Sequence, residues 1–88
     1  MKEIKYQTAL KMFKNGHNVI ICASKMYPGG YWDTGYRLKK LFEYIEDGEL
    51  KHGETPEILF NRLVRWYKWY NCNAETGNNV KYWREYND

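Results

Sequence analysis

Residues 55–86 read TPEILFNRLVRWYKWYNCNAETGNNVKYWREY and contain three of the four Trp residues of the chain. Thr55-Pro56-Glu57 is a favourable helix start, because Thr can cap a first turn and Pro fits the first helical position. Apolar side chains then recur at helical spacing up to a break at residues 71–73, and residues 80–86 alternate as in a strand. We therefore predict a helix that starts at residue 55, then a turn, then a strand at residues 80–86. The predicted buried face of the helix consists of Leu59, Leu63, Trp66 and Tyr70.

Two further helices and one further strand are predicted upstream. The apolar spacing between residues 5 and 14 indicates an amphipathic helix, which Asn15-Gly16 would end. Residues 17–23 contain the β-branched run Val19-Ile20-Ile21-Cys22 and are typical of a strand that is buried on both faces. A second helix is expected from Asp33 or Thr34 to Asp47-Gly48. The predicted buried faces of the two helices are Tyr6, Ala9, Leu10 and Phe13, and Leu38, Leu41, Phe42 and Ile45.

The composition indicates one folded domain over residues 1–88. Hydrophobic residues make up 43% of the 88 residues and aromatic residues 18%, which is enough apolar surface to offset the entropy of ordering the chain. The predicted fold class is α+β, with the order helix–strand–helix–helix–strand. A two-stranded ribbon is marginal in water by itself, so we expect the three helices to cover it. Pairing of residues 80–86 with a second subunit, which would make a homodimer, is the alternative.

The net charge limits the classes of partner, and the cysteine content indicates the cell compartment. A net charge of +3 without a run of basic residues permits contact with nucleic acid but argues against a carboxylate-covered mimic of DNA. No segment approaches the ~18 apolar residues that a membrane span requires. Residues 1–5 lack the apolar run of a signal peptide. Cys22 and Cys72 fit a reduced compartment, so we expect a cytoplasmic protein without a membrane partner.

No motif for catalysis or for a cofactor is present. The spacing of the phosphate-binding P-loop is absent, as are the hydrolase, kinase, dinucleotide-binding and deaminase signatures. His17, His52, Cys22 and Cys72 could form a zinc site by count, but no two of them occur at the short spacing of such sites. Cys72 also has neither a base nor a positive charge beside it that would activate its thiol. We therefore expect a protein that is not an enzyme and that holds no metal or cofactor.

The helix after residue 55 also carries basic and aromatic side chains outside its predicted buried face. Arg has forked donors that match phosphate, and an exposed Trp can stack on a base or on a ring of a protein partner. The loop at residues 24–32 adds Pro28-Gly29-Gly30 and aromatic residues of the types found at binding hot spots. A solvated helix face and ordinary packing are the alternative interpretations. The predicted partner-binding residues are Arg62, Arg65, Lys68, Trp69, Tyr27, Tyr31 and Trp32.

Two other functions are consistent with the sequence. Tyr82, Arg84 and Tyr86 share one side of the predicted strand and would suit a stacking surface for single-stranded nucleic acid. Tyr is also a strong strand former, so ordinary sheet packing is the alternative for this row. The third hypothesis is a protein that sequesters a nucleotide or another small molecule in an aromatic pocket at a subunit interface.

Two stretches of the sequence resemble small orphan accessory proteins of bacteriophages and prophages of low-GC Gram-positive bacteria. These are YNCNAETG at residues 70–77, after an aromatic helix, and VIICASKM at residues 19–26, with Pro28 beyond it. The resemblance implies a protein that acts in the cytoplasm of a bacterial host, and some proteins of this kind inhibit defence systems such as CRISPR effectors. We therefore expect a non-catalytic phage-type binding protein that occupies a protein or ribonucleoprotein partner, with a host defence nuclease as the candidate.

Overall fold

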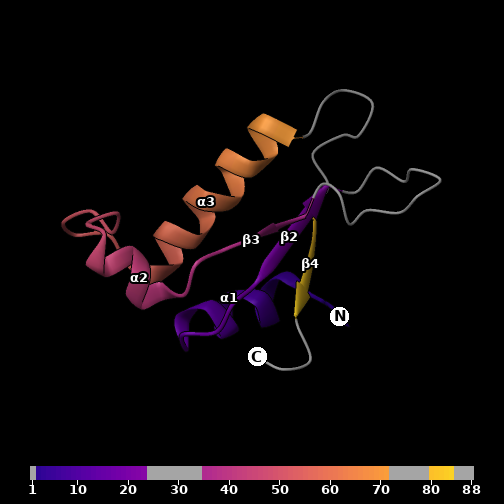
Figure 1. The fold of residues 1–88 in the computed structure, drawn as a ribbon, viewed down its shortest axis with the longest axis horizontal. Coiled ribbons are helices and arrows are strands. Elements are labelled where there is room, and N and C mark those ends of the chain that lie inside the picture. The colour runs from indigo at the N-terminus through magenta and orange to yellow at the C-terminus, as the bar shows by residue number, and fades with distance from the viewer. Residues whose placement is uncertain (1, 24–34, 72–79, 85–88) are drawn as a thin grey trace.

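The computed structural model describes residues 2–23, 35–71 and 80–84 (Figure 1). These residues form a small α+β domain with three helices and one four-stranded antiparallel sheet. In chain order the elements are β1 (Lys2–Ile4), α1 (Tyr6–Lys14), β2 (Ile20–Ala23), β3 (Tyr36–Arg37), α2 (Leu41–Glu46), α3 (Pro56–Asn71) and β4 (Val80–Arg84).

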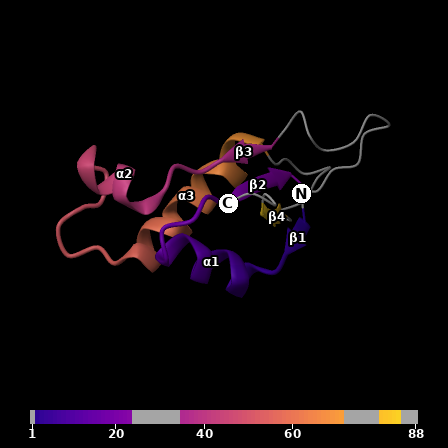
Figure 2. The same ribbon diagram turned by 60° about the horizontal axis from the view of Figure 1, so that its bottom comes forward.

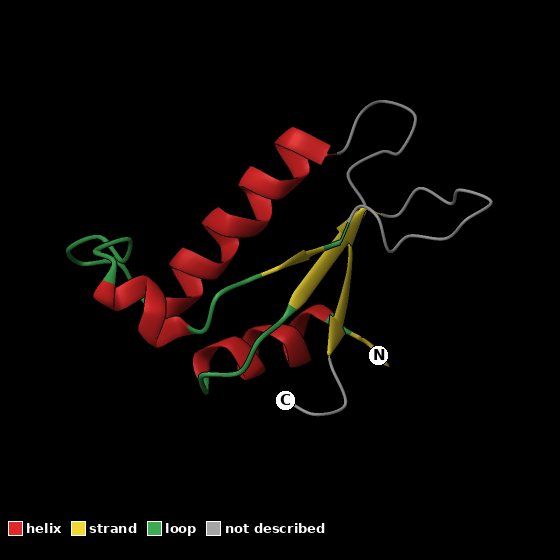
Figure 3. Ribbon diagram, viewed as in Figure 1, coloured by secondary structure: helices red, strands yellow, loops and turns green. Residues whose placement is uncertain are grey.

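The sheet has the strand order β1-β4-β2-β3, so the last strand of the chain lies inside it (Figure 3). Tyr82 of β4 is opposite Ile21 of β2 on one side and opposite Ile4 of β1 on the other. The predicted pair of strands is therefore present as the centre of the sheet. The prediction of a two-stranded ribbon is wrong, however, because β1 and β3 extend it on both sides. Residues 80–84 pair with β2, and residues 82–84 also with β1, of the same chain, so this strand takes its place in the sheet without a second subunit.

One face of the sheet is covered by helices α1 and α3 (Figure 2). Side chains that are directly opposite each other in an antiparallel sheet point to the same face. Ile4, Tyr82 and Ile21 lie opposite one another and form one such row across the sheet. The Tyr82 ring contacts Tyr6 of α1 at 5.8 Å and Phe60 of α3 at 6.2 Å between centroids. Tyr36 of β3 lies in the same row and contacts Trp66 and Tyr67 of α3. Rings on the strands therefore fix where both helices pack.

The first helix and the strand after it agree with the sequence prediction. Helix α1 ends at Lys14, and Gly16 adopts a φ of 89°, a backbone conformation that is sterically unfavourable for a residue with a Cβ. Its predicted face is confirmed, since Ala9, Leu10 and Phe13 are buried. All four residues of the run 19–22 are buried as well, as expected for a strand enclosed on both faces. The buried core consists of Ala9, Leu10, Phe13, Val19, Ile21, Leu38, Tyr44, Leu59, Phe60, Val64, Tyr67 and Tyr82.

The second helix is shorter than predicted and buries a different residue. It starts only at Leu41, because Tyr36 and Arg37 pair with β2 and the Leu38 N–H donates to the Val19 carbonyl at 2.8 Å. Tyr44 is buried, whereas Phe42 and Ile45 of the predicted face are 53% and 51% exposed. The pairing of β3 with β2 therefore determines which side of α2 faces the core.

The third helix starts where the sequence predicts but turns another face inward. The Ile58 N–H donates to Thr55 Oγ1 at 3.2 Å, which confirms Thr55 as the cap. The predicted buried face is wrong in part, because Trp66 is 43% exposed. Apolar residues occur around most of this helix, so the position of the sheet decides which of them are buried. Among residues 56–69 of this helix, the buried ones are Leu59, Phe60, Val64 and Tyr67.

Within residues 2–23, 35–71 and 80–84, no helix combines the length and the apolar composition needed to cross a membrane.

A matched pair of phenylalanines tests these corrected helix faces. Phe60→Ala removes a fully buried ring that packs on Phe13 and Tyr82, and we expect it to lower the free energy of unfolding by about 3–5 kcal/mol. Phe42→Ala removes a ring that is 53% exposed, and we expect a loss below about 1 kcal/mol. Urea denaturation of both variants and the wild type measures the difference. Equal losses would contradict the observed placement of α2.

Candidate functional site

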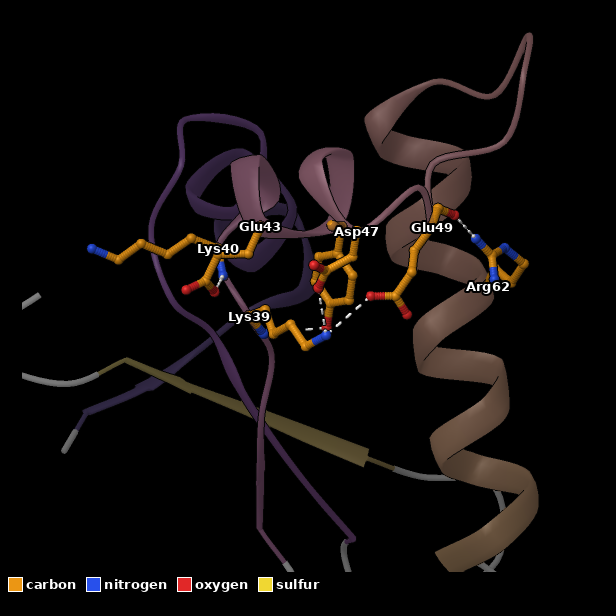
Figure 4. A network of polar contacts seen from close by, with 7 residues as sticks. Lys39, Lys40, Glu43, Asp47, Glu49 and Arg62 are labelled. Atoms are coloured by element: carbon orange, nitrogen blue, oxygen red, sulfur yellow. Dashed lines mark hydrogen bonds and ion pairs between the residues drawn. The ribbon is translucent and has the colours of Figure 1, made fainter.

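A polar network joins the end of β3, helix α2 and helix α3 through the connector, which we define as residues 47–55 (Figure 4). Arg62 of α3 donates to Glu54 through Nε at 3.0 Å and through Nη2 at 3.1 Å, which makes a forked ion pair. Its Nη2 also donates to the Glu49 carbonyl at 2.7 Å. The side chain of Glu54 is only 8% exposed. Arg62 therefore holds the connector against α3.

Lys39 forms the second centre of this network. Its Nζ lies 3.0 Å from Asp47 Oδ2 and 3.0 Å from Glu49 Oε2, and 5.4 Å from the centre of the Tyr44 ring. The hydrogen bonds to Asp47 and Glu49 raise the pKa of Lys39 above its ordinary value. Pairs this exposed add little to stability. Their effect is geometric, because Glu49 is held from one side by Lys39 and from the other by Arg62.

The network forms the rim of a pocket of about 380 Å³ between β3, α2 and α3. The Tyr36 and Trp66 rings meet edge to face at 5.3 Å and form its aromatic wall. Burial raises the pKa of Tyr44 to about 12, so its hydroxyl is protonated at neutral pH. Since the cations on the rim are already in ion pairs, the pocket suits an uncharged aromatic or amphipathic group. The lining residues are Tyr36, Lys39, Tyr44, Glu49, Arg62, Leu63 and Trp66.

Among the α3 residues whose side chains the structure describes, three large apolar ones are exposed on the outward side of the helix. Ile58 is 51% exposed, Trp66 43% and Trp69 77%. Spacings of three, eight and eleven residues place all three side chains on one half of the helix surface. We call these three residues the docking face. Trp66 belongs to both the docking face and the wall of the pocket, so the two form one continuous surface.

On the other flank of α3 lies a second hollow, of about 450 Å³, which we call the basic hollow. It is lined by residues of α3, by the first residue of α1 and by the centre of β4. Two of the predicted partner-binding residues, Arg65 and Lys68, come together here. The lining residues are Tyr6, Asn61, Val64, Arg65, Lys68 and Tyr82.

The structure thus distributes the predicted partner-binding residues over three environments. Arg62 pairs with the connector, Arg65 and Lys68 line the basic hollow, and Trp69 is exposed on the docking face. The helix therefore does not present its three predicted cations on one surface. The predicted loop residues Tyr27, Tyr31 and Trp32 lie outside the described residues.

The described part of the predicted stacking row, Tyr82 and Arg84, lies on the side of β4 that faces the helices. Tyr82 is 9% exposed and its ring packs between Tyr6 and Phe60, so it cannot stack on a base. Arg84 is on the same face of β4, opposite Lys2 of β1. Tyr86 lies outside the described residues. The assignment of Tyr82 as an exposed stacking residue is therefore corrected, because α1 and α3 cover this side of the sheet.

The candidate zinc residues are placed only in part. Cys22 is buried in β2, His17 precedes that strand, His52 lies in the connector, and Cys72 is outside the described residues. In the part of the chain that the structure describes, no three His, Cys, Asp or Glu side chains are grouped so that they could hold a metal ion.

Of the residues on the docking face and in the pocket wall, the sequence predicted only Arg62 and Trp69 as binding residues, and Tyr36 and Ile58 are among those that it missed. It also placed Trp66 in the core. The available signal was the excess of apolar residues on α3, since a helix that packs one face on a sheet cannot bury residues on all sides. Tyr36 gave no signal, because β3 has only two residues and shows no alternation.

The ion pair of Arg62 with Glu54 predicts a pH dependence of stability. Hydrogen bonds from Arg62 hold the pKa of Glu54 below its ordinary value of 4.5, so the folded state gains from the ionised carboxylate above that pH. This gain is lost as the pH falls through the lowered pKa. We expect Glu54→Gln to destabilise the protein at neutral pH, and we expect its difference from wild type to shrink as the pH falls through the lowered pKa of Glu54.

The measurement is urea denaturation of both proteins across that pH range. Glu46→Gln is the control, because it removes an exposed carboxylate on α2 for which no described ion pair exists. A constant difference between wild type and Glu54→Gln at all pH values would show that the ionised pair does not stabilise the connector.

Comparisons with known proteins gave no relative for this chain. No protein-family model matches it, and no curated protein or solved structure matches it either. The functional conclusion therefore depends on the surface of α3 and its two flanking hollows.

Proposed function

We propose that this protein is a non-catalytic binding protein that occupies a protein or ribonucleoprotein partner through the docking face of α3. The observation that carries the proposal is the 77% exposure of Trp69 on a regular 16-residue helix, next to the partly exposed Trp66. Leaving such large rings in water is costly, and apolar patches of this kind mark interaction sites.

The residue types and their support also favour a protein partner. Trp, Tyr and Arg dominate binding hot spots because they offer large contact areas and directional donors. Here the rings lie on a helix that is packed on the sheet through Phe60, Val64 and Tyr67. A surface that is already ordered before binding loses less entropy when a partner docks. The pocket beside Trp66 adds a cavity that an apolar side chain of the partner could fill.

The resemblance to small phage accessory proteins leads us to propose a host defence nuclease as the partner. The net charge of +3 and the exposed apolar residues argue against inhibition by imitating the DNA surface. Such a protein would instead block a protein surface that the nuclease needs for assembly, for target binding or for movement between its domains.

The test is a pair of substitutions on the docking face that leaves the two hollows intact. Trp69→Ala with Ile58→Ala removes most of the exposed apolar surface while leaving Trp66 in the pocket wall. If Trp69 is a binding hot spot, its loss costs about 2 kcal/mol of binding free energy, which weakens the affinity roughly thirtyfold. Since both side chains are more than half exposed, the melting temperature should change by less than about 4 °C.

Activity can be measured by plating a targeted phage on bacterial strains that each carry one active CRISPR effector. The wild-type protein should restore plating on at least one strain, and the double variant should not. Phe42→Ala is the matched control, because it removes another exposed ring, on α2, and should act as wild type does. Restoration on no strain would exclude these effectors as partners, and equal restoration by the double variant would overturn the docking face.

A further inference from the structure

The basic hollow differs in chemistry from the docking face and from the pocket at the connector. Helix α3 contributes Asn61, Val64, Arg65 and Lys68 at spacings that place them on one side of the helix. Tyr6 and Tyr82 close the hollow from α1 and β4. The described lining includes two cations and no carboxylate.

Both cations of the hollow are available to a ligand. Neither Arg65 nor Lys68 forms an ion pair with a residue that the structure describes, whereas Arg62 on the same helix donates through Nε and Nη2 to Glu54 and to the Glu49 carbonyl. Two like charges three residues apart on a helix repel each other in the absence of a counter-ion. An anion in the hollow would remove that repulsion.

Neutral donors lie beside these cations. The Tyr6 hydroxyl donates to Asn61 Oδ1, so the amide NH₂ of Asn61 is left as the donor end of that side chain. No hydrogen bond from this NH₂ to a described residue is present. The Tyr82 hydroxyl is a further donor, since burial and the nearby Tyr6 raise the pKa of Tyr82 and keep the phenol protonated.

We propose that the basic hollow binds the phosphate group of a nucleotide or of a polynucleotide backbone. A guanidinium offers two parallel donors, and an ammonium, an amide NH₂ and a phenol add three further groups around the same space. This number of donors matches the three or four oxygens of a phosphate better than the two oxygens of a carboxylate. An uncharged ligand would have to desolvate both cations without compensation.

The hollow also continues toward the sheet edge. Tyr6 and Tyr82 line a neighbouring hollow of about 450 Å³ together with Lys5 and Lys81, where Lys81 lies 3.7 Å from Glu3. A single phosphate would occupy only the basic hollow. A phosphodiester chain could extend past the two tyrosines to Lys5 and Lys81, although Glu3 also lines that neighbouring hollow. If the backbone is the natural ligand, a mononucleotide and an oligonucleotide should therefore differ in affinity.

The test is calorimetric titration of the full chain with inorganic phosphate, thymidine monophosphate and a ten-nucleotide oligo-thymidine in phosphate-free buffer at low salt. We expect binding of at least one probe and a loss of at least tenfold in affinity for Arg65→Gln with Lys68→Gln. Lys11→Gln with Lys14→Gln removes the same charge from α1 and should leave the affinity within twofold. Lys68→Arg keeps the charge and should keep the binding.

The probes also separate the two sources of phosphate. Tighter binding of the oligonucleotide than of the mononucleotide would assign the hollow to a polynucleotide backbone. In that case the affinity falls with rising salt, and the Arg65→Gln/Lys68→Gln variant should release about two fewer counter-ions on binding than the wild type. Equal affinity for both would assign it to a free nucleotide. Absence of binding for all three probes, or an equal loss in the Lys11→Gln/Lys14→Gln control, would overturn the proposal. Neither result depends on Trp69, so the docking face is tested separately.

Discussion

The pairing of β4 with both β2 and β1 is the constraint on which the rest of the structure depends. This strand comes last among the elements of the chain but lies inside the sheet, so the sheet is complete only when the two ends of the chain meet. Its Tyr82 faces the helices and packs against a ring from α1 and a ring from α3. The position of both helices, and with it the orientation of α3, therefore follows from the register of this one strand.

The orientation of α3 divides its side chains into three groups with different consequences. The side toward the sheet builds the core, the outward side exposes two Trp rings, and one flank presents Arg65 and Lys68 beside Asn61. A protein with a small interior cannot bury every apolar residue of such a helix. Rings that remain exposed on a rigid helix become a surface that a partner can cover, and this is the physical basis of the proposed binding function.

Arginines on the same helix can differ in role although their chemistry is the same. Arg62 lies close to the connector, where Glu54 and the Glu49 carbonyl take up its donors, and so it acts as a structural tie. Arg65 lies less than one turn further along and meets no carboxylate among the described residues. The difference arises from the path of residues 47–55, which returns to α3 on one flank only.

The sequence by itself determined the α+β class, the bounds of α1, the buried run at residues 19–22 and the cap at Thr55, because periodicity and capping depend on neighbouring residues. Only the tertiary structure decided that β1 and β3 are strands, since two or three residues show no period and pair only when β4 and β2 are in place. It also decided which side of α3 is buried, because apolar residues occur around most of that helix. For the same reason the exposure of Trp66 could not be predicted, because it depends on strands that are distant in sequence from α3. The separate role of Arg62 depends on the path of the connector, which brings Glu54 and the Glu49 carbonyl to its guanidinium.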